Sequence, residues 1–210
     1  MIQPHAVSAV PEDFISEIQF EIDLCPIDAI ELHLRRSIIE FCEKTHYWKE
    51  PATPIDVIAG EVSYPVAIAA GLESVGIVCV GDEESEIELV RSDDPCVTYR
   101  YWQSSPGHID LYPNDLLTGK TLSVVVAVRP VVVAEAFMVS APLLADYRTA
   151  LIAGAKSALY KVPKKSWTDL QQANIENSTF EAIASNARRY AARGYTAMPD
   201  QPVQKIRSFY

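Results

Sequence analysis

The chain has 210 residues, of which 49% are hydrophobic and 22% are charged, and its formal net charge is −10. This balance excludes a disordered chain, a collagen-like repeat and a disulfide-dense miniprotein. The acidity argues against a general nucleic-acid binder, because such proteins usually carry a basic face.

The N-terminal quarter reads as helical. Residues 11–19 can form a short helix, and residues 26–48 carry apolar side chains at the three- and four-residue spacings of an amphipathic helix. Pro26 suits the first helical position, and we expect Pro51 and Pro54 to end this long helix.

The middle of the chain reads as strands. Short runs rich in β-branched residues alternate with Gly, Pro, Asp and Asn, and turn signals recur roughly every ten residues, which is typical of an antiparallel sandwich or small barrel. The predicted strands cover residues 55–59, 62–66, 75–80, 86–90, 96–102, 108–112 and 122–129. The acidic run from Asp82 to Glu86 most simply caps a solvated hairpin.

Two helices follow. An apolar stripe predicts a helix over residues 143–160, and Thr168 with Gln171 forms a capping box for a second helix that ends at Gly194. Residues 198–210 have two prolines and no helical or strand period, so we expect an extended tail. That tail is either a frayed terminus or a docking arm, since it carries several large apolar side chains.

The sequence predicts an α+β fold: an antiparallel bundle of three main helices with an inserted all-β sandwich or barrel-like subdomain. The bundle would comprise residues 1–50 and 141–195, the β-rich insertion residues 51–140 and the extended arm residues 196–210. Lysine and arginine number 4, 4 and 10 in residues 1–50, 51–140 and 141–210, against 10, 13 and 5 acidic residues. These opposite signs can steer copies of the chain onto one another or onto a partner.

No motif for catalysis, a metal or a cofactor is present in the sequence. The four cysteines are scattered, which favours reduced, mostly buried thiols over a zinc site. Glu43 and His46 form a single Glu-x-x-His step, which is best interpreted as an ordinary surface pair because di-iron bundles need two such steps. The longest apolar run, residues 124–134, is too short to cross a bilayer, and no signal-peptide pattern is visible.

Several segments carry a resemblance to a family. Residues 34–48 read L-R-R-S-I-I-E-F-C-E-K-T-H-Y-W and resemble the first long helix of head–tail adaptor (connector) proteins of tailed bacteriophages. Residues 151–160 with Pro163 and Trp167 resemble the second helix of that family and its exit, and residues 180–194 resemble the third. The strand entry at residues 54–60 and the exit at 129–130 also fit. Ser37, where alanine is usual, and Lys164, in place of glycine, depart from the pattern.

The resemblance implies a structural role without enzyme activity or a cofactor. Such adaptors form a ring, commonly of twelve copies, under the portal protein at the neck of the virion, and they offer a platform to tail and nozzle proteins. Double-stranded DNA passes through without specific binding, no membrane is involved, and assembly takes place in the host cytoplasm. An acidic lumen suits such a conduit because it repels phosphate.

The C-terminal arm is the site that we expect to dock on the portal. In this hypothesis residues 199–210 bind there, with Lys205 and Arg207 making polar contacts and Ile206, Phe209 and Tyr210 filling grooves.

Two other functions stay open. One is a tail-side completion protein that recognises another tail component through its β domain. An exposed patch of Tyr99, Tyr101 and Trp102 would favour it, although alternation places Trp102 on the opposite face and core packing is the simpler interpretation. The other is a virion-associated cell-wall hydrolase with two facing carboxylates.

Overall fold

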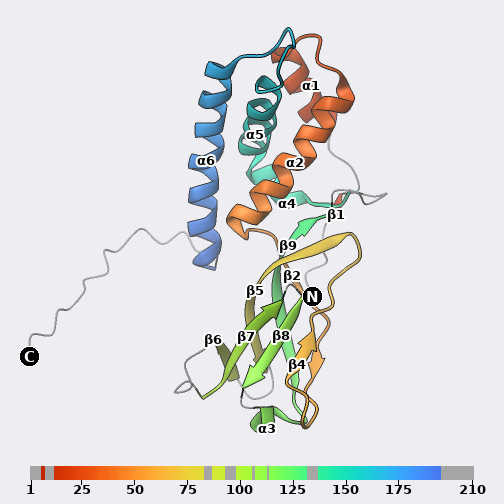
Figure 1. The fold of residues 1–210 in the computed structure, drawn as a ribbon, viewed down its shortest axis with the longest axis vertical. Coiled ribbons are helices and arrows are strands. Elements are labelled where there is room, and N and C mark those ends of the chain that lie inside the picture. Colours follow the sequence, from red (N-terminus) through yellow and green to blue (C-terminus); the bar gives the residue numbers. More distant parts are fainter. Residues whose placement is uncertain are drawn as a thin grey trace, which may run out of the picture.

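The computed structural model describes residues 6–7, 12–82, 87–92, 98–105, 107–112, 114–131 and 137–194. Figure 1 shows an elongated molecule with helices at one end and a curled sheet at the other. The helices are α1 (Glu12–Glu21), α2 (Ile27–Thr45), α3 (Asn114–Leu117), α4 (Ala141–Asp146), α5 (Arg148–Tyr160) and α6 (Leu170–Ala192). The strands are β1 (Ala6–Val7), β2 (Lys49–Pro51), β3 (Ile55–Asp56), β4 (Ser63–Pro65), β5 (Leu72–Asp82), β6 (Ile87–Arg91), β7 (Arg100–Ser105), β8 (His108–Tyr112), β9 (Thr121–Pro130) and β10 (Val139–Ser140).

The helix predicted over residues 26–48 is confirmed as α2, but it ends earlier and for another reason than the prolines. His46 adopts a left-handed conformation with φ of 53°, and its N–H donates to the carbonyl of Cys42. A left-handed residue at this position closes the last turn of a helix. The chain then enters β2 at Lys49, so strand and helix are separated by only three residues.

The predicted helix over residues 143–160 is divided into α4 and α5 at Tyr147, whose φ and ψ are −120° and 20°. The ring of Tyr147 packs against Phe41 and Tyr47, with centroid distances of 4.8 and 4.7 Å. These aromatic contacts pack the junction between α4 and α5 against the end of α2.

Helices α2, α5 and α6 pack closely around Gly154. A methyl group there would collide with Ser37 Oγ and lie 2.8 Å from Phe180 Cδ2. Ser37 Oγ donates to the carbonyl of Leu151 at 2.8 Å, which joins α2 to α5 inside the core. The glycine therefore permits this close approach of three helices.

The sheet has eight strands in the order β2-β9-β5-β6-β7-β8-β4, with β3 also paired to β9. The pairs in this sheet are antiparallel except β6 with β7, which is parallel and departs from the predicted all-antiparallel arrangement. A separate antiparallel pair joins β1 to β10. Strand β8 occupies the predicted residues 108–112, whereas β2, β10 and α3 were not predicted.

The predicted fold class is wrong. The structure is a mixed α/β fold in which the curled, half-barrel-like sheet forms much of the molecule (Figure 1), and it is not a three-helix bundle with an inserted β subdomain. The physical reason is the central strand β9, which packs against α2 as well as pairing with its neighbours. Buried side chains of helices and strands form one continuous core. The predicted extended arm, residues 196–210, lies outside the described residues.

Candidate functional site between the helices and the sheet

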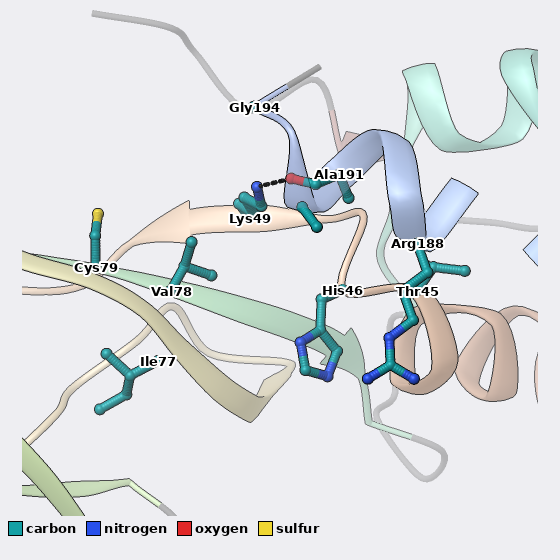
Figure 2. A pocket seen from close by; sticks show the side chains of 10 residues that line it. Thr45, His46, Lys49, Ile77, Val78, Cys79, Arg188, Ala191 and Gly194 are labelled. Atoms are coloured by element: carbon teal, nitrogen blue, oxygen red, sulfur yellow. Dashed lines mark hydrogen bonds between the residues drawn. The ribbon is translucent and has the colours of Figure 1, made fainter. Parts of the chain in front are cut away.

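A pocket of about 490 Å³ lies where the helices meet the sheet. It is lined by the end of α2, by β2, by the middle of β5 and by the end of α6 (Figure 2). Its cationic and imidazole side chains are His46, Lys49 and Arg188, and among the described residues no carboxylate lines it. The pocket is thus basic within a chain that is acidic as a whole.

Local structure places each of these side chains. The left-handed cap at His46 turns the chain out of α2, and Lys49 follows as the first residue of β2. The Nζ of Lys49 donates to the carbonyl of Ala191 at 2.8 Å, at the negative end of α6 (Figure 2). Arg188 lies on the last turns of that helix, close to the imidazole of His46 in Figure 2.

The electrostatics of the pocket disfavour further positive charge. Partial burial, together with the charges of Arg188 and Lys49, lowers the pKa of His46 below its usual value. Burial likewise lowers the pKa of Lys49. An anionic group in the pocket would stabilise both protonated forms, so the arrangement suits a carboxylate or phosphate.

The remaining wall of the pocket is apolar. Ile77 and Val78 contribute from β5, and Ala191 and Ala192 contribute from α6. A bare inorganic anion does not need such a wall, whereas an acidic side chain flanked by apolar neighbours does. The pocket thus combines cationic and apolar side chains.

Large apolar side chains are exposed at the two ends of the molecule. At the helical end, formed by the α1–α2 turn and the α5–α6 connection (Figure 1), Leu24 is 76% exposed and the nearby Phe20 is 91% exposed. At the opposite end, which we call the sheet tip (residues 58–64 and α3), Ile58 and Leu116 are 58% and 57% exposed. Large apolar side chains are also exposed between the ends, at Val90, Trp102 and Ile175. Because exposed apolar side chains that gather into a patch mark interaction sites, we take both ends as candidate contact surfaces.

The aromatic patch that would favour a tail-side binding protein does not form. Tyr101 is buried at 3% exposure, and Tyr99 packs against the core. Trp102 is 43% exposed on the other face, as alternation predicts, with the guanidinium of Arg91 5.9 Å from its ring centroid.

The structure also tests other sites that the sequence analysis singled out. Glu43 pairs with Arg129 rather than with His46, so the Glu-x-x-His step is not a pair in the structure. Asp82 is buried and bonds Lys120 at 2.7 Å, while residues 83–86 lie outside the described part. The portal-docking residues Lys205, Ile206, Arg207, Phe209 and Tyr210 also lie outside it.

The thiols follow the prediction where they are described. Cys25 and Cys42 are free thiols, and both are buried. Burial raises the pKa of Cys42 to about 12, so this thiol is unreactive at neutral pH. Within the same described residues, no cluster of three potential metal ligands occurs, and no helix has the length and apolar character to span a membrane.

Sequence reasoning missed the basic pocket, because its residues are separated by more than 130 positions along the chain. The sequence signal that could have indicated it is the group of arginines at 188, 189 and 193, near the end of the last helix. No family model matches the chain, and no curated protein matches it.

Proposed function

We propose that the chain is a structural protein of a tailed-phage virion, a head–tail adaptor that forms a ring under the portal, continues the DNA conduit and provides the platform for tail attachment. The observation that carries the proposal is the exposure of large apolar side chains at both ends of an elongated molecule. A protein that joins two other bodies needs separate contact surfaces, and buried apolar area supplies most of the stability of such contacts.

Two further features support the same proposal. The segments that resemble adaptor helices form α2, α5 and α6, which pack directly on one another. The net charge of −10 suits a wall that DNA slides past, because like charges repel at short range. No enzyme activity, cofactor or metal enters this proposal.

Co-sedimentation with the portal ring of the same phage tests the proposal. We expect the intact chain to bind stoichiometrically and a version lacking residues 199–210 to stay in the supernatant. A matched control keeps the arm's length and charges but replaces Ile206, Phe209 and Tyr210 with serine. We expect this variant to bind at least about tenfold more weakly, because the loss of buried apolar side chains costs more than 1.4 kcal/mol.

An intact chain that stays in the supernatant would contradict the adaptor function and favour a tail-side binding protein. Stoichiometric binding that survives truncation would keep the adaptor function but remove the docking role of the arm. A loss of turbidity of purified cell wall with the intact chain would instead support the hydrolase.

A further inference from the structure

The loop at the sheet tip is held in one shape by its own side chain. The buried Tyr64 hydroxyl accepts a hydrogen bond from the N–H of Ile58 at 3.0 Å, and it lies 2.7 Å from the carbonyl of Glu61 and 3.1 Å from that of Ile58. The adjacent connection after α3 is tied to the same loop, since Gly119 N–H donates to the carbonyl of Val57. Residues 58–64 are therefore ordered before any partner binds.

This ordered loop presents both apolar and acidic groups to solvent. Ile58 and Val62 are exposed on either side of Glu61, which is exposed as well. Asp115, next to the exposed Leu116, adds a second carboxylate at the tip. Among the described residues, neither Glu61 nor Asp115 forms an ion pair with a lysine or arginine.

The tip and the basic pocket have complementary chemistry. The tip offers carboxylates between apolar side chains, and the pocket offers cationic groups beside the exposed Val78. Ile77 is buried and points to the other face of β5 (Figure 2). The two surfaces lie at different places on the same chain, at the end of the sheet and at its junction with the helices. A contact between two different surfaces of identical chains is head-to-tail, and it closes into a ring when the rotation between copies allows.

We propose that the basic pocket receives the sheet tip of a neighbouring copy of this chain, with Glu61 entering between Arg188, Lys49 and His46. This contact is the subunit interface of the ring. Closure into a ring rests on the proposed function, whereas the contact between two copies does not. Arg188 and Lys49 hold the carboxylate, while Ile58 and Val62 pack on Val78 and on the alanines at the end of α6. The ordered tip lowers the entropy cost of this docking.

Charge reversal with sedimentation velocity at increasing protein concentration tests the interface. We expect Arg188→Glu and Glu61→Arg each to weaken self-association at least about tenfold, because each places like charges opposite one another. The double variant restores an opposite-charge pair across the interface, so its self-association should return toward that of the unmodified chain. Arg189→Glu is the matched control, since Arg189 lies on the same helix but does not line the pocket and bonds Asn186 instead.

Zero-length cross-linking of amines to carboxylates provides a second readout that does not depend on a destabilising change. We expect an intermolecular link between Lys49 and Glu61, identified by mass spectrometry. Lys49→Arg keeps the charge but removes the reactive amine, so the link should disappear while self-association persists.

The proposal would be overturned by an unmodified chain that stays monomeric at all concentrations, by single reversals that behave like Arg189→Glu, or by a double variant without recovery. Self-association lost on removal of residues 199–210 would place the arm in the contact instead. Portal binding is a separate measurement. If the chain binds the portal and the charge reversals leave its self-association unchanged, the adaptor function stands and this interface is excluded. If the charge reversals do weaken self-association but the chain does not bind the portal, the interface stands and the adaptor function is excluded.

Discussion

At the scale of single residues, one lysine joins three helices. Lys156 of α5 is buried, and its Nζ lies 2.8 Å from an oxygen of Glu21 and 3.0 Å from one of Glu176. Burial acts to lower the pKa of Lys156, but the hydrogen bonds to both carboxylates outweigh it and raise the pKa. Because the folded pKa is raised, this stabilisation is present at neutral pH and is lost only as the pH rises through that value.

We expect Lys156→Met to destabilise the protein by about 3 kcal/mol, because Glu176 would remain with its charge largely buried and no cation beside it. Urea unfolding at pH 7 measures this loss. The double variant Lys156→Met/Glu176→Gln also removes the unpaired carboxylate charge of Glu176, so it should recover most of the lost stability. Equal losses in the single and the double variant would show that the methionine packs badly and that the ion pair contributes little.

At the scale of elements, the cap of α6 differs from the expected one by a single position. The capping box predicted for Thr168 and Gln171 is wrong. Asp169 is the N-cap, and its carboxylate accepts from the N–H groups of Gln171 and Gln172 at 2.9 and 3.0 Å. The Thr168 hydroxyl instead donates to the carbonyl of Val162 and accepts from the N–H of Lys165, which folds the connection before the helix.

Asp169→Ala should therefore lower the free energy of unfolding by about 1 kcal/mol, the usual cost of an N-cap side chain. Gln171→Ala is the control that distinguishes the predicted Thr168–Gln171 capping box from the observed Asp169 cap. A capping box would make it costly, whereas the observed cap involves only the backbone of Gln171, so we expect a change within about 0.5 kcal/mol. Thermal or urea unfolding of both variants measures the difference, and a larger loss for Gln171→Ala would contradict the cap.

Local pattern predicted most helices and strands because their signals are local. The 3.6-residue period located α2, and a short run bounded by turn residues located β8 at its observed bounds. Strand β2 was missed because it has three residues and exists through pairing with β9, more than 70 positions away. The pocket was missed for the same reason, since the fold alone brings Arg188 to His46 and Lys49. Ile27 is the first apolar residue in the periodic pattern of α2, yet it is exposed, which shows that periodicity does not identify the end of a buried face.

At the scale of the whole molecule, the error in the predicted fold class lies in how helices and sheet are joined. The sheet begins three residues after α2, and Val128 N–H of β9 donates to the carbonyl of Trp48 at 2.9 Å. Trp48 and Val128 are both buried in the continuous core. A strand-rich segment between helices is compatible with an independently folded insertion and with a sheet that shares its core with the helices. Only the burial along β9 distinguishes these two arrangements.

A shared core predicts that helices and sheet unfold together. Native-state hydrogen exchange in increasing urea should therefore show the slowest amides of α5 and of β9 converging on one opening free energy. Val128→Ala, which removes two buried carbon groups at the junction, should lower that value by about 2 kcal/mol for both elements at once. Sheet amides that open at a lower free energy while α5 stays protected would instead show two units, and a loss confined to β9 in Val128→Ala would lead to the same conclusion. Equal losses in both elements would place the junction that holds the basic pocket inside the cooperative core, so that the pocket keeps its shape for as long as the chain is folded.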